Sequence, residues 1–340
     1  MRVLFVAPPR IGLYVGGLEI QIEKTAQELS NLGIDVVRYD PWRNQLTEVD
    51  LVHAFTFDSS LLPFAELAKR STRPFVLSPV SNLIAAPVIF NRLRVRMSRF
   101  IPGFCSDIKR AQQLCDLSTH VVAQTEREYS LFVDVFGVPT NKVSVINNGT
   151  DGIFAYGDPV LFETKYGVRH FVLMVGSIDP NKNQLMIIRA LNGTNIPLVI
   201  IGSPPLGADA YYKECVAAAG PNILFVGQLK REDPLLASAY SAATLFVMPS
   251  FRETWGLAIY EAAQAGCSLV ISDKIPTNPI LSSHLKRISP GQRNKWRQVI
   301  MEHYRVPNSK RRPTLAPGRL PSWCDIATNL SLIYEDSIQT

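Results

Sequence analysis

Two glutamates, Glu253 and Glu261, stand eight residues apart in a stretch that reads as strand, loop, helix and strand. Residues 244–249 form a short apolar run typical of a buried parallel strand, and 254–265 have helix formers at helical spacing. Eight residues advance a helix by about 12 Å, so both carboxylates could contact one elongated ligand lying along the helix. A plainer interpretation has Glu253 capping the helix and Glu261 in solvent, and spacing alone favours it because such pairs are common.

The start of this predicted helix is suited to a phosphate or diphosphate. Amides of a first helical turn lack partners and carry partial positive charge. Gly256 has no side chain, so a ligand could approach the backbone closely there. Thr254, Trp255 and Gly256 are therefore candidate ligands through their backbone amides.

The residues around the two glutamates resemble a known motif. The run PSFRETWGLAIYEAAQAG is similar to the E-x7-E motif of retaining glycosyltransferases of the GT4 family (glycosyl transferases group 1). The resemblance implies an α/β architecture, the GT-B fold, in which two Rossmann-like domains with parallel sheets face a central cleft. It also implies that Glu253 contacts and orients the transferred sugar, and that Glu261 hydrogen-bonds the ribose hydroxyls of a nucleotide donor.

Length and composition describe an ordered globular protein. The 340 residues, 46% apolar and 19% charged, suffice for two domains. Five cysteines without a CxxC pair predict reduced thiols and a cytoplasmic location, and no cluster of Asp, His or Cys suggests a metal site. No apolar stretch reaches transmembrane length, and the first seven residues are too short and strand-like for a signal peptide. The net charge of +6 permits an anionic partner without naming one.

The first domain is expected over 1–150 and opens with a strand, a loop and a helix. The loop reads VGGLE, not GxGxxG, so the dinucleotide fingerprint of an oxidoreductase is absent. A tight turn would explain Gly16 and Gly17 on their own. In GT4 enzymes, however, a Gly-Gly loop followed by a glutamate faces the donor diphosphate and the acceptor. The resemblance therefore implies donor contacts from Gly16 and Gly17 and an acceptor-side place for Glu19.

The acceptor side departs from the family pattern. His53 ends a predicted strand, which is an active-site position in open α/β sheets, although a structural histidine is the more common explanation. GT4 members often carry Pro-His-Gly after the strand predicted at 74–78. Here Pro79 is followed by Val80, so the histidine is missing and the acceptor-side chemistry is expected to differ.

A basic segment at 85–104 interleaves arginines with large apolar residues. A solvated basic helix and a helix in contact with an anionic membrane fit this pattern equally well. GT4 enzymes that extend glycolipids commonly dock their first domain on the cytoplasmic face of a membrane, so peripheral attachment is a hypothesis. The arginines concerned are Arg92, Arg94, Arg96 and Arg99.

The second domain is expected over 151–321, with a final helix at about 322–340 crossing back onto the first. Lys182 precedes a predicted helix, and a lone loop lysine is usually solvated. Here it matches the lysine of the family's G-R-L-x-x-x-K-G segment, which neutralises donor phosphate. Ser177 replaces the arginine of that segment, so another basic residue would have to supply the second contact.

The nucleotide base has candidate contacts after the strand predicted at 222–227. In the family the two residues that follow this strand lie against the base, and here they are Gln228 and Leu229.

The resemblance implies a glycosyltransferase that moves a sugar from a nucleotide-sugar donor to a glycan or lipid-linked acceptor with retained anomeric configuration. Cell-surface polysaccharide or lipopolysaccharide synthesis is the expected setting. Electrostatic stabilisation of the leaving diphosphate without a metal would drive the reaction, and no nucleic acid partner is expected. Two alternatives remain: a nucleotide-sugar 2-epimerase of the same architecture, and a non-catalytic nucleotide-sugar-binding module.

Overall fold

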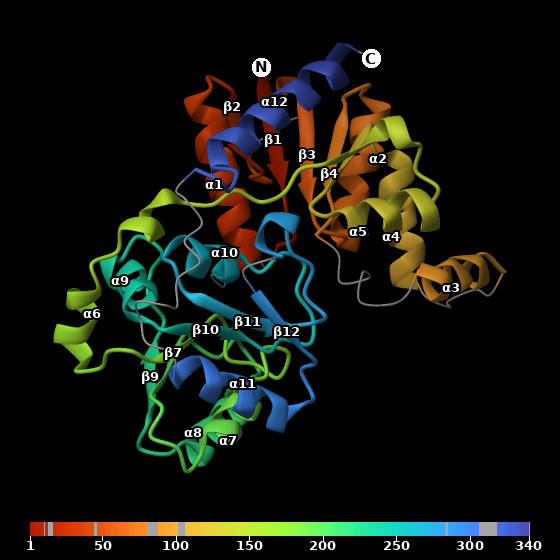
Figure 1. The fold of residues 1–340 in the computed structure, drawn as a ribbon. Coiled ribbons are helices and arrows are strands. Elements are labelled where there is room, and N and C mark those ends of the chain that lie inside the picture. The colour runs from red at the N-terminus through yellow and green to blue at the C-terminus, as the bar shows by residue number, and fades with distance from the viewer. Residues whose placement is uncertain are drawn as a thin grey trace. The chain divides into compact units, whose positions relative to one another are not determined.

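The chain forms two compact units (Figure 1). In the computed structural model the first unit comprises Met1–Gly149 together with Trp323–Thr340, and the second comprises Thr150–Ser322. The structure describes residues 1–9, 11–12, 16–43, 46–80, 88–100, 106–282, 285–305 and 318–339, with the backbone alone at 88, 98–100 and 106.

The first unit is built on a six-stranded parallel sheet in the order β2-β1-β3-β4-β5-β6. Its strands are short apolar runs because a parallel sheet is buried on both faces. The strands are β1 (Arg2–Val6), β2 (Asp35–Arg38), β3 (Leu51–Phe55), β4 (Phe75–Ser78), β5 (His120–Ala123) and β6 (Val143–Val145). The helices are α1 (Gly17–Asn31), α2 (Leu62–Arg70), α3 (Val88–Phe100), α4 (Ser106–Leu117), α5 (Glu126–Ser130) and α12 (Trp323–Gln339).

The helix α12 completes the core of the first unit. Its buried residues Ile326, Leu330 and Tyr334 pack in one apolar cluster with Val3 and Phe5 of β1. The helix also lies against α1, as Figure 1 shows for the blue C-terminal helix beside the red N-terminal elements. Apolar residues three to four positions apart give α12 the single apolar face that this packing requires.

The second unit has a six-stranded parallel sheet in the order β12-β11-β10-β7-β8-β9. Its strands are β7 (Val172–Val175), β8 (Leu198–Ile201), β9 (Ile223–Gly227), β10 (Leu245–Met248), β11 (Ser268–Ser272) and β12 (Leu285–Ile288). Its helices are α6 (Pro159–Tyr166), α7 (Gln184–Leu191), α8 (Asp209–Ala218), α9 (Pro234–Ala242), α10 (Leu257–Gln264) and α11 (Arg293–Arg305). Two parallel sheets flanked by helices confirm the α/β prediction.

The strand order of the second sheet reverses between β7 and β10, which are hydrogen-bonded neighbours. In open α/β sheets ligands bind outside the carboxyl ends of the strands at such a reversal, because the two loops there leave in opposite directions. The loops concerned are 176–183 after β7 and 249–256 after β10.

The helix that carries Glu261 begins later than the sequence predicted. A helix was expected over 254–265, but α10 begins at Leu257. Gly256 has a φ of +77°, a left-handed conformation that glycine adopts without a steric penalty and that ends a regular helix. Glu253 therefore lies in the preceding loop and does not cap the helix, and the 12 Å helical spacing from Glu261 does not apply.

Among the helices that the structure describes, none is long and apolar enough to span a membrane. Cys115, Cys215 and Cys324 carry free thiols.

Candidate functional site

Backbone and amide hydrogen bonds tie together the two loops at the strand reversal of the second unit. The carbonyl oxygen of Asn181 accepts a hydrogen bond from the amide of Phe251 at 2.8 Å, and Asn181 Nδ2 donates to the carbonyl oxygen of Arg252 at 2.9 Å. Asn183 Nδ2 donates to the carbonyl oxygen of Pro249 at 3.3 Å. The loops after β7 and β10 thus form one structural element at the carboxyl edge of the sheet.

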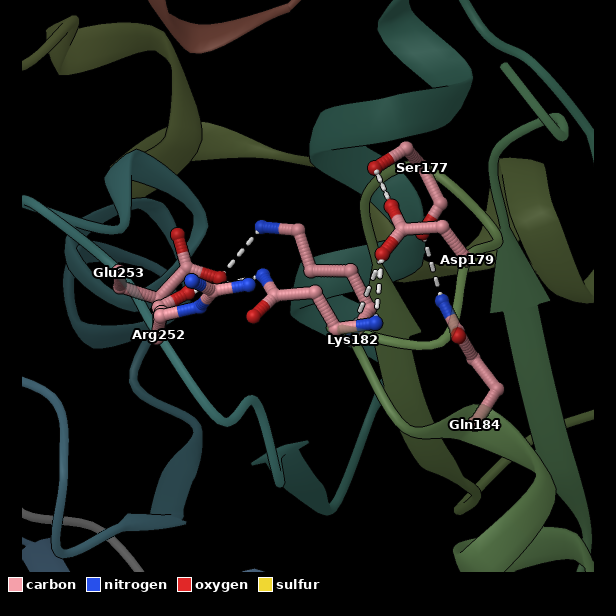
Figure 2. A network of polar contacts seen from close by, with 7 residues as sticks. Ser177, Asp179, Lys182, Gln184, Arg252 and Glu253 are labelled. Carbon is pink, nitrogen blue, oxygen red and sulfur yellow. Dashed lines mark hydrogen bonds and ion pairs between the residues drawn. The ribbon is translucent and has the colours of Figure 1, made fainter. Parts of the chain in front are cut away.

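This element brings together Lys182 and Glu253, which stand 71 residues apart in the chain (Figure 2). Lys182 Nζ lies 2.6 Å from Glu253 Oε1, and the two side chains are only 21% and 11% exposed. Lys182 and Glu253, which the sequence suggested for separate reasons, therefore form one ion pair. The pair lies at the strand reversal, where ligands bind in open α/β sheets. A largely shielded pair of this kind interacts more strongly than one at the surface.

Asp179 shapes the loop that carries Lys182. Its Oδ1 accepts hydrogen bonds from the backbone amides of Asn181 at 2.8 Å and Lys182 at 3.2 Å. Its Oδ2 accepts one from Ser177 Oγ at 2.6 Å, as Figure 2 shows. Ser177, which stands where the family has an arginine, thus orients Asp179 and supplies no positive charge.

The backbone is closely packed beside this loop. A Cβ on Gly202, after β8, would lie 1.9 Å from the carbonyl oxygen of Gly176, after β7. Only glycine permits this approach of two backbones. Lys182 extends past Gly176, since a Cβ there would meet its Cε at 3.6 Å.

Trp255 is packed into the protein and does not project toward a ligand. Its side chain is buried, and its ring stacks on Tyr260 with centroids 4.5 Å apart and planes 4° apart. The donor contact expected at Trp255 is therefore limited to its backbone. Thr254 lies in the same loop and is half-buried.

Glu261 is 4% exposed, so the interpretation of this residue as a solvated helix position is wrong. Its Oε1 pairs with Arg231 Nη1, and its Oε2 accepts a hydrogen bond from the hydroxyl of Tyr240 at 2.7 Å. Arg231 also pairs through Nε with Asp151 Oδ2 at 2.6 Å. Arg231, Tyr240 and Asp151 could not be predicted from the sequence, because no motif or helical spacing links them to position 261.

Gln228 and Leu229 directly follow β9, on the same edge of the sheet as Lys182. Gln228 is exposed, and its Oε1 accepts a hydrogen bond from Ser203 Oγ at 3.0 Å. Leu229 is half-buried. Their contact with a nucleotide base stays a prediction.

In the first unit, Gly16, Gly17 and Glu19 lie where α1 begins, after β1. Gly16 precedes the helix in an extended conformation without a side-chain cap. The Glu19 carboxylate folds back over it, since a Cβ on Gly16 would lie 2.9 Å from Glu19 Oε2. Val80 is half-buried just beyond β4. The roles expected of these four residues stay predictions.

His53 does not belong to an acceptor site. It lies at the centre of β3, is fully buried, and both ring nitrogens are occupied: Nδ1 by the hydroxyl of Tyr334 at 2.6 Å and Nε2 by Ser78 Oγ at 2.8 Å. Burial lowers the pKa of His53 from 6.5 to about 3. The prediction that placed His53 on the acceptor side is wrong, because the strand continues past it to Phe55 and encloses the ring.

Within the basic segment, residues 88–100 form α3, whose Asn91 and Val95 are buried while Ile89, Phe90 and Leu93 are exposed by 79%, 53% and 53%. The remainder of the segment lies outside the described residues. Arg92 Nε donates to the carbonyl oxygen of Asp134 at 2.8 Å, and Arg94 Nη2 lies 3.5 Å from Asp107 Oδ2. Arg96 is exposed, and the side chain of Arg99 lies outside the described residues.

Within the parts of the chain that the structure describes, no three His, Cys, Asp or Glu side chains are grouped as a metal site requires.

A model of a known protein family matches part of the second unit. The family described as "Glycosyl transferases group 1" matches residues 162–290, a range that contains Lys182, Glu253 and Glu261. The D-rhamnosyltransferase WbpZ of Pseudomonas aeruginosa is 25% identical over 84% of this chain and 72% of its own length. The D-inositol 3-phosphate glycosyltransferase of Kribbella flavida is 29% identical over 47% of this chain, but that alignment spans only 41% of the relative.

Solved structures match the whole chain. The protein Alr3699/HepE of Anabaena, in complex with UDP and glucose, superposes with a TM-score of 0.72 at 17% identity, over 98% of this chain and 99% of that one. The sucrose-phosphate synthase of Thermosynechococcus elongatus gives a TM-score of 0.76 at 17% identity, over 98% of each chain. At these identities the likeness concerns the fold alone. Residues 162–290 thus match the glycosyl transferases group 1 family, and the chain has the GT-B fold.

Proposed function

We propose that the protein is a retaining glycosyltransferase of the GT4 type, whose second unit binds a nucleoside diphosphate sugar. The Lys182–Glu253 pair carries this proposal: a cation suited to phosphate and a carboxylate suited to sugar hydroxyls meet at the strand reversal. The UDP and glucose complex of the Anabaena protein supports a nucleotide-sugar donor, and the D-rhamnosyltransferase relative supports transfer of a sugar. A glycan or lipid-linked acceptor in cell-surface glycan synthesis is part of the proposal.

The Lys182–Glu253 pair suggests a separate role for each residue in the transfer reaction. The donor diphosphate competes with Glu253 for the ammonium of Lys182, and a cation placed on the departing phosphate stabilises the charge that develops there. Glu253 is then free to accept hydrogen bonds from the transferred sugar and to orient it. Gly16, Gly17 and the amides of Thr254 to Gly256 complete the diphosphate contacts, and Glu261 binds the ribose.

No metal has a part in this scheme, because Lys182 and backbone amides neutralise the phosphates. Transfer should therefore survive EDTA. Loss of activity on chelation, with recovery on addition of Mg²⁺ or Mn²⁺, would show that the leaving group depends on a metal.

The two glutamates provide the test of function. Glu253→Gln should remove most sugar transfer and leave nucleotide affinity within about threefold, because its partner is the sugar, whereas Glu261→Ala should weaken binding of the nucleotide itself by about tenfold or more. Glu214→Gln, which breaks the surface ion pair with Arg189 in the same unit, is the matched control and should change neither. Thermal shift with UDP, GDP, ADP and their sugars gives binding, and release of nucleoside diphosphate with a glycan acceptor gives turnover.

Two results would contradict the proposal. Equal losses of nucleotide affinity in the Glu253 and Glu261 variants would disprove the separate roles. A free epimerised sugar product, without transfer to any acceptor, would identify a 2-epimerase, and donor binding without turnover would identify a binding module.

A further inference from the structure

We infer that Arg231 and Tyr240 are positioning residues that hold Glu261 as a paired acceptor for two neighbouring ribose hydroxyls, so that the site selects ribonucleotides over 2′-deoxyribonucleotides. The inference rests on the proposed function, since it assumes that a nucleotide binds at Glu261. Beyond that function, the inference explains why the Glu261 carboxylate would distinguish ribose from 2′-deoxyribose in the nucleotide.

The hydrogen bonds of Glu261 leave room for two more donors. A carboxylate offers about four acceptor positions, two on each oxygen. Arg231 Nη1 occupies one position on Oε1, and the Tyr240 hydroxyl occupies one on Oε2. One position on each oxygen remains for a ligand, and two hydroxyls on adjacent carbons match this arrangement.

Arg231 is held on three sides and cannot follow a moving carboxylate. Its Nε pairs with Asp151, its Nη1 pairs with Glu261, and its guanidinium carbon lies 5.0 Å from the ring centre of Phe154. Its side chain is only 9% exposed, and Nη2 is buried without a hydrogen-bond partner among the described residues. A planar guanidinium supports two carboxylates at once in a way that a lysine ammonium does not.

Tyr240 fixes the other oxygen of Glu261. Its ring is fully buried and meets Phe154 edge-on, with centroids 5.4 Å apart. Burial, followed by the nearby charge of Glu261, raises the pKa of Tyr240 well above its ordinary value. The hydroxyl therefore remains a donor, and Glu261 receives one fixed donor on each oxygen.

A carboxylate fixed in this way distinguishes hydroxyl groups sharply. When the 2′-hydroxyl is missing, one buried acceptor position loses its donor, and a site built around a hydroxyl rejects the analogue that lacks it. A mobile carboxylate would turn to the remaining hydroxyl or to water and would discriminate weakly.

The experiment compares matched nucleotide pairs by titration calorimetry: UDP, GDP and ADP, each against its 2′-deoxy form. For the wild-type protein, the ribonucleotide that binds best should bind about tenfold tighter than its 2′-deoxy form, or more. Tyr240→Phe should weaken the ribonucleotide about tenfold and the deoxyribonucleotide less than about threefold, so that the preference shrinks. Arg231→Lys should change the preference in the same direction.

Tyr211→Phe is the control. It removes another tyrosine hydroxyl of the second unit, one that accepts a hydrogen bond from the amide of Leu185, and it should preserve the preference. A wild-type protein that binds both forms equally, or variants that lose affinity for both forms in equal proportion, would overturn the inference and leave the proposed function standing. Failure of all three ribonucleotides to bind would overturn both. If Tyr240→Phe does not fold, the wild-type preference and Arg231→Lys decide.

Discussion

The burial of His53 makes the stability of the fold depend on pH. The imidazole is enclosed between β3 and α12, and its pKa is lowered to about 3 by burial. The ring is therefore neutral in the folded protein at physiological pH. Unfolding returns it to water, where it binds a proton below about pH 6.5.

The sign of the pH dependence follows from this difference. Between pH 6.5 and 3 the unfolded chain binds more protons at His53 than the folded chain, so stability is complete above pH 6.5 and falls as the pH drops. His53 should lower the free energy of unfolding by about 2 kcal/mol at pH 5 relative to pH 7. Urea unfolding of the wild-type protein and of His53→Gln at both pH values measures it, and the variant should lose this part of the difference.

His303→Gln is the control, because this half-buried histidine of α11 lies in the second unit. It should retain the wild-type difference. Identical pH dependence in the wild type and His53→Gln would show that the imidazole does not carry the effect.

The sequence specified the residues of the site better than their surroundings. Lys182 and Glu253 could be predicted because both match motif positions that follow strands. The two strands are neighbours in the sheet, so the side chains come together. Arg231 and Tyr240 could not be named, since their contact with Glu261 depends on how α9 and its preceding loop pack. His53 was misjudged for a similar reason: an apolar run locates a strand, but only packing shows which of its polar residues are enclosed.

At the scale of elements, apolar runs predicted strands in both sheets, whereas β12 was missed. Its sequence LKRI has exposed Lys286 and Arg287 between less exposed ends. The strand lies at the edge of the sheet and pairs only with β11, and charged residues are favourable at such an edge. A rule that looks for buried apolar runs therefore overlooks it.

The helix α3 is the element on which membrane attachment depends. Its exposed side combines Phe90 and Leu93 with Arg96, while Arg94 is partly neutralised by Asp107. Each basic residue near an anionic surface contributes about 1 kcal/mol, and exposed apolar side chains can enter the interface. Fewer arginines are available than the sequence suggested, so we propose an association that is weak and sensitive to salt.

Sedimentation with vesicles tests this proposal. The variant Leu93→Ser with Arg96→Glu should lose sedimentation with phosphatidylserine vesicles at low salt and should keep its nucleotide affinity. Leu67→Ser with Lys69→Glu is the matched control, because it removes an exposed leucine and reverses a charge on α2 of the same unit, and it should sediment as the wild type does. A wild-type protein that ignores these vesicles would show that α3 is a solvated helix.

At the scale of the whole molecule, the second unit is an insertion in the first. The chain leaves the first unit after Gly149 and returns to it at Trp323. The two ends of the second unit lie side by side, because the amide of Thr150 donates to the carbonyl oxygen of Pro321 at 2.9 Å and Thr150 pairs with Ser322 in a parallel bridge. An inserted unit with adjacent ends can fold without the remainder of the chain.

Removal of α12 tests this independence. A chain ending at Ser322 loses Ile326, Leu330 and Tyr334 from the core of the first unit, where replacing even one buried leucine by alanine costs about 2–5 kcal/mol. The first unit should unfold, while the second should still bind nucleotide, with an affinity reduced by the loss of the contacts proposed for Gly16 and Gly17. Calorimetry should show one remaining transition that nucleotide stabilises, and loss of that transition would show that the second unit depends on the first.

The discontinuity of the first unit has a consequence for its synthesis. Strands β1 to β6 leave the ribosome before the second unit, yet α12, which covers Val3 and Phe5, leaves after it. At bacterial and eukaryotic rates of about 5–20 residues per second, the wait lasts on the order of ten seconds. Throughout that interval we expect an apolar face of the nascent sheet to stay uncovered, and slower translation across the inserted unit would lengthen its exposure to chaperones and to neighbouring nascent chains.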